Sequence, residues 1–231
     1  MPITLGSGIT IGPGITISSD IVSSGLVVQL TGASYPGSGT TWADLINSDN
    51  NATLVNSPVY SSANGGYFTF ASASSQYATL AGSPLTTTSY TKSCWFYLNS
   101  IADNNLISYS DPGGHYMFFA ATSTLYCGHT AWTGFPTTFA STTTFATSRW
   151  YNVSLTFNTT DGMFLYVNGA LDNSYTAQKT APTASQCNLA CYAAAGNLLN
   201  GRIGEVLIYN RSLTATEVSQ NFNTSKNLYG F

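Results

Sequence analysis

The chain has 231 residues, of which 43% are hydrophobic and only 6% are charged, against about 25% charged residues in an average soluble domain. Its six Lys and Arg residues are scattered along a chain of net charge −3, which excludes the basic surface that nucleic acids require. An aromatic content of 13% argues against disorder. The abundance of Thr, Tyr, Val, Ile and Phe favours half-buried strands. The composition predicts a mostly-β protein that recognises its partner by shape, hydrogen bonds and stacking.

Residues 1–20 form a distinct segment with an internal repeat. Gly6–Ile11 reads GSGITI and Gly12–Ile17 reads GPGITI, so each unit is a glycine-rich turn followed by a short alternating strand. Two such units cannot bury a core alone. We therefore expect an arm that adds strands to the main domain, a sister subunit or a larger assembly, with a free tail as the alternative. The residues expected to dock are Ile9, Ile11, Ile15 and Ile17.

The first residues of the chain, MPITLG, lack the basic start and apolar run of a signal peptide. No stretch approaches the roughly 18 apolar residues that a membrane-spanning helix needs. These features predict synthesis in a cytosol and no membrane partner.

From residue 21 onward the pattern predicts one β domain, because many short apolar segments alternate with Ser, Gly, Asn and Pro loops. The expected strands are 66–70, 77–80, 91–98, 106–109, 117–120, 151–157 and 163–167. In the 151–157 segment, alternation predicts one buried and one solvated face. Asn168-Gly169 is a strong signal for a tight hairpin.

A single helix is expected near the C-terminus. Thr214 and Glu217 have the spacing of a capping box. In this motif the side chain of each residue accepts a hydrogen bond from the backbone amide of the other. Val218 and Phe222 fall on one face of a helix of two to three turns, which we expect to pack on a sheet.

The four cysteines are Cys94, Cys127, Cys187 and Cys191. Their spacing matches no zinc motif. A disulfide between Cys187 and Cys191 is geometrically possible in a loop, but the expected cytosolic synthesis favours reduced, structural thiols.

In order, these segments resemble the laminin-G-like branch of the concanavalin A-like lectin/glucanase superfamily. The pieces that carry the resemblance are GLVVQL (25–30), WADL (42–45), NNATL (50–54), GYFTF (66–70), SCWFY (93–97), RWYNV (149–153), LYVNG (165–169), GRIGEV (201–206) and YNRSL (209–213). The resemblance covers residues 21–231 and implies a jelly-roll sandwich of two antiparallel sheets with one short C-terminal helix. It places Trp42, Trp95 and Trp150 in the core. A domain of this kind behind a Gly/Ile-rich start also looks like structural proteins of tailed phages.

Hydrolysis of glycosides, which some superfamily members perform, requires a pair of carboxylates. The chain has only two glutamates, Glu205 and Glu217, and the second belongs to the capping box. No strand carries two carboxylates at alternate positions. The only histidines, His115 and His129, accompany no nucleophile motif. The sequence predicts a non-enzymatic protein.

Calcium is a weaker expectation. Asp44, Asn47 and Asp49 form an oxygen-rich stretch of the type that hard cations prefer. The loop 71–76, however, reads ASASSQ, where relatives often carry two aspartates. Turns stabilised by Asx side chains are the favoured interpretation, with no cofactor.

Glycan binding has positive support. Lectin sites combine an aromatic platform with polar groups on loops, and the segment 115–135 offers Tyr116, His129, Trp132 and Phe135. Trp132 is the strongest candidate, because exposed Trp side chains usually have a use.

Two functions follow. The first is a structural protein on a virion surface, a capsid decoration or a head or tail appendage, that is made in the host cytoplasm and joins itself, as a trimer, and other virion proteins through its arm. The alternative is a carbohydrate-binding module for host surface glycans.

Overall fold

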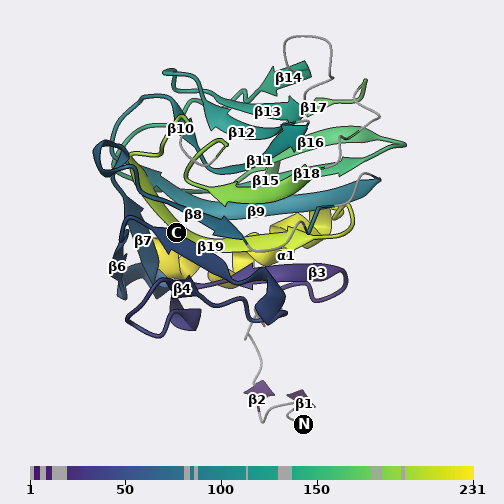
Figure 1. The fold of residues 1–231 in the computed structure, drawn as a ribbon. Helices are drawn as coiled ribbons and strands as arrows, with labels where there is room; N and C mark the ends of the chain where they lie inside the picture. The colour runs from purple at the N-terminus through teal and green to yellow at the C-terminus, as the bar shows by residue number, and fades with distance from the viewer. Residues whose placement is uncertain are drawn as a thin grey trace.

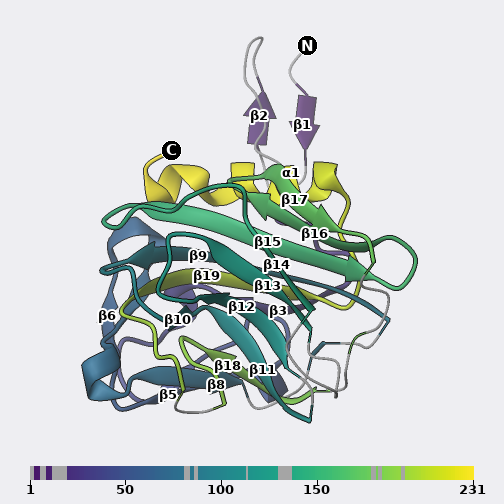
Figure 2. The same ribbon diagram turned by 90° about the horizontal axis from the view of Figure 1, so that it is seen from above.

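A computed structural model describes residues 3–5, 9–11, 20–80, 84–85, 88–112, 114–129, 137–177, 181, 184–193 and 196–231. Their architecture is a sandwich of two antiparallel sheets with a helix packed outside one of them (Figures 1 and 2). This confirms the predicted all-β jelly-roll class.

The nine-stranded sheet has the spatial order β14-β13-β12-β11-β18-β8-β5-β4, and β10 pairs with β12 beside that path. Its strands are β4 (Thr41–Trp42), β5 (Ala52–Val55), β8 (Tyr77–Leu80), β10 (Asn104–Asn105), β11 (Ile107–Pro112), β12 (His115–Phe119), β13 (Leu125–His129), β14 (Thr137–Ala140) and β18 (Ala184–Leu189).

The eight-stranded sheet has the order β17-β16-β15-β9-β19-β7-β6, and β3 pairs with β19. Its strands are β3 (Leu26–Leu30), β6 (Val59–Ser61), β7 (Tyr67–Phe70), β9 (Ser89–Leu98), β15 (Trp150–Asn158), β16 (Gly162–Val167), β17 (Ala170–Tyr175) and β19 (Gly201–Tyr209). The expected hairpin at Asn168-Gly169 joins β16 to β17, and both residues have positive φ, as the tight turn requires.

The main core lies between the sheets. From β15 it receives Val153, Leu155 and Phe157, all fully buried, which confirms one half of the predicted alternation. The other half was wrong about solvent: Ser154 and Thr156 are also buried. The physical reason is that the C-terminal segment packs on the outer face of this sheet as a third layer (Figure 2).

That third layer is built around α1 (Ala215–Ser225). The Thr214 hydroxyl accepts a hydrogen bond from the Glu217 amide, and the Thr214 amide donates to the Glu217 carboxylate. Val218 is buried and Phe222 stacks on Trp95. The capping box and the packing face of this helix are therefore confirmed. Short 3₁₀ helices occur at Gly32–Ser34, Ser48–Asn50, Ala63–Gly65, Ser72–Ser74 and Lys226–Tyr229.

The three predicted core tryptophans are all buried. Trp42 belongs to the core between the sheets, whereas Trp95 and Trp150 form a second cluster with Tyr229 beneath the C-terminal layer. The Trp95 and Tyr229 rings stack with centroids 4.2 Å apart.

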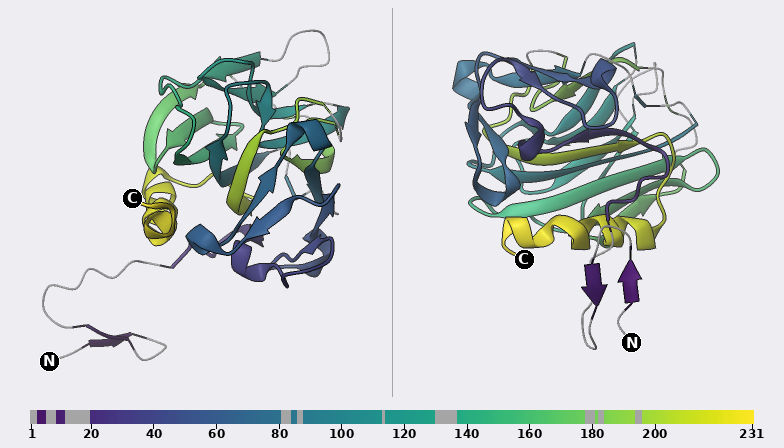
Figure 3. Two further views of the ribbon diagram at one scale, coloured as in Figure 1. Left: turned by 90° about the vertical axis from the view of Figure 1, so that its left-hand side faces the viewer. Right: turned by 90° about the horizontal axis from the view of Figure 1, so that it is seen from below.

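At the N-terminus, β1 (Ile3–Leu5) and β2 (Ile9–Ile11) pair with each other as a separate antiparallel hairpin. In the described part of the chain they form no ladder with either large sheet, and Figures 1 and 3 show the hairpin apart from the sandwich. The expected strand containing Ile9 and Ile11 is thus present, whereas Ile15 and Ile17 lie outside the described residues.

The chain joins the sandwich beside α1. The Gln220 side chain donates to the Asp20 carbonyl oxygen at 2.8 Å, and the Val22 amide donates to Asn221 at 2.9 Å. The hairpin is therefore tethered on the helix side of the molecule (Figure 3).

All four cysteines are buried and free. Within the described residues, no helix is both long and apolar enough to span a bilayer.

Candidate functional site

The residues expected to bind glycans have different surroundings in the structure. Tyr116 is half-buried in β12. His129 is fully buried at the end of β13, where its Nε2 lies 2.7 Å from the Tyr90 hydroxyl. The expectation that Tyr116 and His129 lie on loops was therefore wrong, and His115 is also a buried strand residue. Trp132 and Phe135 lie outside the described residues.

Tyr116 belongs to a row of aromatic rings that we call the aromatic platform: Tyr192, Tyr116, Phe118 and Tyr126. Consecutive ring centroids in this order are 5.4, 5.8 and 5.7 Å apart. The hydroxyls of Tyr116 and Tyr192 are 3.4 Å apart. All four residues are half-buried, so the row presents rings to solvent that also contact one another.

Strand alternation places the platform on the outer face of the nine-stranded sheet. The residues of β12 that flank Tyr116 and Phe118, such as Met117 and Phe119, are fully buried in the core between the sheets. Successive side chains of a strand point to opposite faces, so the platform rings face away from that core. Phe118 lies directly opposite Tyr126 in the antiparallel ladder, where cross-strand side chains come closest.

A glycine next to the platform leaves room for one of its rings. A Cβ atom at Gly114 would collide with the ring of Tyr116, so this ring can occupy its position only because residue 114 has no side chain. Ser108 and Asn105, in strands that pair with β12, are fully buried beside the platform: Ser108 donates to Asn105, and the Asn105 amide donates to the Asn197 carbonyl oxygen at 3.1 Å. The platform and these neighbours are uncharged, which matches a neutral, hydroxyl-rich ligand.

The candidate calcium residues form Asx turns, as the favoured interpretation predicted. The Asp44 carboxylate accepts the amides of Gln29 at 2.7 Å and Ile46 at 3.1 Å. The Asn47 side chain accepts the amide of Asp49 at 3.0 Å. These oxygens therefore stabilise the loop.

Both glutamates contact the C-terminal segment. Glu217 makes a bidentate ion pair with Arg211 at 2.9 and 2.7 Å, which together with the cap at Thr214 lowers its pKa to about 2. Glu205 accepts a hydrogen bond from the Ser225 hydroxyl at 3.2 Å, and burial raises its pKa to about 7. Both glutamates thus contact the helix layer, Glu217 as an ion pair and Glu205 as a buried acid.

A buried lysine is the least expected feature of the core. Lys92 is fully buried in β9, and its ammonium donates to the carbonyl oxygens of Ile107 at 3.0 Å and Tyr116 at 3.3 Å. Burial lowers its pKa to about 8, and burial raises the pKa of the nearby Cys127 and Cys187 thiols to about 12. These thiols are therefore protonated and unreactive at neutral pH.

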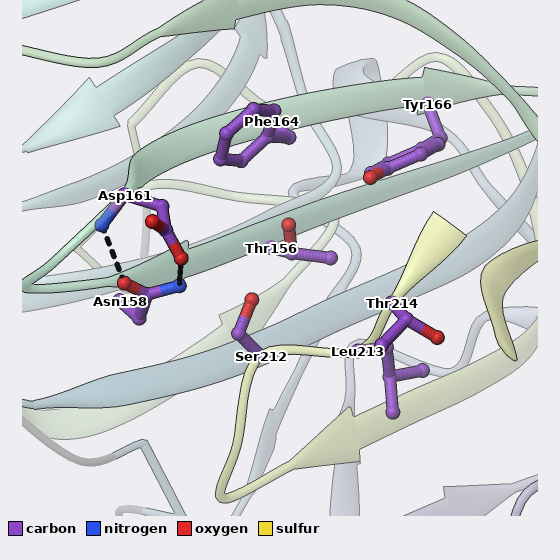
Figure 4. A pocket seen from close by; sticks show the side chains of 8 residues that line it. All are labelled: Thr156, Asn158, Asp161, Phe164, Tyr166, Ser212, Leu213 and Thr214. Carbon is purple, nitrogen blue, oxygen red and sulfur yellow. Dashed lines mark hydrogen bonds between the residues drawn. The ribbon is translucent and has the colours of Figure 1, made fainter. Parts of the chain in front are cut away.

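A hollow of about 250 Å³ lies on the opposite sheet from the aromatic platform, between the β15–β16 hairpin and the loop that leads into α1 (Figure 4). Its walls combine two aromatic rings, several hydroxyls and one carboxylate. The lining residues are Thr156, Asn158, Asp161, Phe164, Tyr166, Ser212, Leu213 and Thr214.

The fold and the platform define a class: a lectin-like jelly-roll domain with a row of aromatic rings on one outer sheet face. The family model described as the concanavalin A-like lectin/glucanases superfamily matches residues 72–219. The chain belongs to this superfamily, as the resemblance implied. A search among proteins with curated descriptions finds none that matches the chain.

Several solved structures share the fold. The binding domain of Paraclostridial Mosquitocidal Protein 1 has a TM-score of 0.70 and 16% identity over 90% of this chain and 55% of its own. The botulinum neurotoxin type G receptor binding domain has a TM-score of 0.66 and 13% identity over 85% and 50% of the two chains. A Trypanosoma rangeli sialidase has a TM-score of 0.68 and 15% identity over 91% and 34%. The chain thus spans about half or less of the length of these structures.

Sequence reasoning found Tyr116 but missed Phe118, Tyr126 and Tyr192. An available signal was the aromatic i, i+2 pair Tyr116 and Phe118. That signal was ambiguous because the alternate residues of the same strand are also apolar, so alternation did not reveal which set faces outward.

Proposed function

We propose that this chain is a non-enzymatic recognition module that binds glycans through the aromatic platform. The observation that carries the proposal is the row of four half-exposed rings on the outer face of the nine-stranded sheet. Aromatic faces pack against the C–H faces of sugar rings, and the tyrosine hydroxyls of the platform can hydrogen-bond to sugar hydroxyls.

The comparisons support this choice. One of the similar structures is described as the binding domain of a mosquitocidal protein and another as the receptor binding domain of a neurotoxin. A third is a sialidase, which was also solved in complex with sialic acid. A fold shared at such low identity does not transfer function, so the proposal depends on the platform itself.

A glycan array with the full chain tests the proposal, followed by titration of the best glycan against variants. Tyr116→Ala is expected to weaken binding at least tenfold, about 1.4 kcal/mol. The matched control is Phe231→Ala, because Phe231 is an aromatic side chain, 43% exposed, in the C-terminal layer. Binding is expected to be unchanged in this control.

Two results would contradict the proposal: no glycan bound at all, or equal binding by the wild type and Tyr116→Ala. Trp132→Ala extends the test to the earlier candidate. A loss in Trp132→Ala with none in Tyr116→Ala would move the site from the platform to the 130–136 segment.

We propose a second function, assembly, because the N-terminal hairpin forms a sheet of its own. A two-stranded hairpin is marginally stable alone, and its free edges can pair with further strands. The hairpin attaches the module to sister subunits or to a larger particle. The resemblance to structural proteins of tailed phages favours a virion, with synthesis in the host cytoplasm, display on the virion surface and a trimer as the first expectation.

A further inference from the structure

The hollow beside α1 is built on ordered elements. β15 contributes Thr156 and β16 contributes Phe164 and Tyr166, while Ser212 and Leu213 come from the loop that follows β19. These residues belong to strands and to a capped helix entrance, so the shape exists before any ligand binds.

Part of the lining of the hollow consists of buried side chains and one half-buried ring. Thr156, Tyr166 and Leu213 are buried at its base, and the half-buried ring of Phe164 forms a wall (Figure 4). The ring is therefore partly accessible from the hollow, and an accessible aromatic ring can pack on the C–H face of a sugar.

The turn between β15 and β16 fixes the carboxylate of Asp161 at the rim. The Asn158 side chain accepts the amides of Thr160 at 2.9 Å and Asp161 at 2.6 Å, and it donates to Asp161 Oδ2 at 3.0 Å (Figure 4). Within the residues that the structure describes, the second oxygen, Oδ1, makes no hydrogen bond inside the protein. A positioned acceptor thus remains for a ligand.

The charges around the hollow are otherwise compensated. Glu217 is paired with Arg211, and the Thr214 hydroxyl is engaged by the Glu217 carboxylate at 3.0 Å. Among the described residues that line the hollow, Asp161 is the single charged one, and Ser212 contributes a neutral hydroxyl (Figure 4). The lining therefore offers one strong acceptor, neutral hydroxyl groups and two aromatic rings, of which Phe164 is the more exposed.

We propose that this hollow binds a single neutral hexose unit. Asp161 Oδ1 accepts hydrogen bonds from two neighbouring sugar hydroxyls, Ser212 hydrogen-bonds to a third, and Phe164 packs on the C–H face. At about 250 Å³ the hollow is smaller than the 300–1,000 Å³ of most drug-sized sites, so it fits one sugar ring. The site lies on the opposite sheet from the aromatic platform and is independent of it.

Amide chemical shifts of the full chain, recorded during titration with the methyl glycosides of glucose, galactose and mannose, test the proposal. At least one glycoside is expected to bind with a Kd of about 1 mM or weaker and to shift the amides of residues 156–166 and 212–214. Asp161→Asn and Phe164→Ala are each expected to weaken this binding about tenfold. Asp161→Asn keeps an oxygen at the rim, so it reports on the site even if Phe164→Ala fails to fold.

The matched controls are Asp103→Asn, which changes another exposed aspartate, and Phe118→Ala, which alters only the platform. Both are expected to keep the binding at the hollow. The two sites can therefore be tested separately. A negative result at the platform does not decide the hollow, and a negative result at the hollow does not decide the platform.

Three results would overturn the proposal. The first is the absence of shifts around the hollow with every glycoside. The second is equal binding by Asp161→Asn and the wild type. The third is tighter binding of tetramethylammonium than of any glycoside, which would make the hollow a cation site formed by the carboxylate and the ring.

Discussion

Lys92 shows at the scale of one residue how a charge persists in a β core. Its two hydrogen bonds go to backbone carbonyl oxygens, not to a carboxylate. A buried charge without an opposite charge costs stability, and the lowered pKa of about 8 expresses that cost. The thiols that surround it stay neutral and do not compensate it.

Lys92→Met is expected to raise the free energy of unfolding by about 1–3 kcal/mol at pH 7, because the methionine removes the buried charge at similar length. The folded-state pKa of Lys92 is about 8, below the 10.4 of an unfolded lysine. Between these values only the unfolded state binds the proton, so the wild type gains stability relative to the variant as pH rises. Urea unfolding of both proteins at pH 7 and 9.5 measures this, with Lys226→Met as control. Parallel pH profiles would contradict the assignment.

Glu205 makes stability depend on pH in the opposite direction from Lys92. Its folded-state pKa of about 7 lies above the usual 4.5, so the folded state retains a proton that the unfolded state has lost. The stability contributed by this proton is complete below pH 4.5 and is lost as pH rises to 7.

Glu205→Gln is therefore expected to lose less stability than the wild type between pH 5 and 7, by roughly 1–2 kcal/mol after allowance for partial exposure. Thermal unfolding across this range measures the difference. Glu217→Gln is the contrasting control, because the pKa of Glu217 is lowered to about 2 and its contribution is lost only on acidification below about pH 4.5. An identical profile for Glu205→Gln and the wild type would disprove the linkage.

At the scale of elements, α1 was predictable because its signals are local. A capping box and an i, i+4 pair need only a few consecutive residues, and both were read from the sequence. The platform was less predictable, because β12 has apolar residues on both faces and only the packing of the other sheet determines which face is buried.

Thr214→Ala is expected to lower the free energy of unfolding by about 1 kcal/mol, the usual cost of removing a helix cap. It also removes a donor to the Glu217 carboxylate. Urea unfolding followed by tryptophan fluorescence is a suitable probe, since Trp95 lies beneath the helix layer. Thr216→Ala, at an exposed position of the same turn, is expected to be neutral or slightly stabilising. Equal effects of both changes would argue against the cap.

At the scale of the whole molecule, the two proposed functions occupy opposite sides. The hairpin is tethered beside α1 by Asp20 and Val22, whereas the platform lies on the outer face of the other sheet. Attachment through the arm would leave the platform facing away from the particle.

Deletion of residues 1–19 is expected to convert an oligomer, a trimer by first expectation, into a folded monomer. The deletion retains the contacts of Asp20 and Val22 with α1, so the thermal midpoint should change little. Light scattering of both proteins measures the mass. An unchanged oligomer after deletion would show that the sandwich itself carries the interface.

The sequence by itself determined the fold class, the main strands, the helix with its cap and the burial of three tryptophans, because propensity, alternation and capping are local properties. Tertiary structure decided the rest. The helix layer buries the face of β15 that alternation had predicted to be solvated. His129 is buried because it belongs to the paired strand β13 and not to a loop. The row of Tyr192, Tyr116, Phe118 and Tyr126 combines two paired strands with a distant loop. Such a site exists only when pairing register and layer order bring separate segments together, and no local pattern encodes that contact.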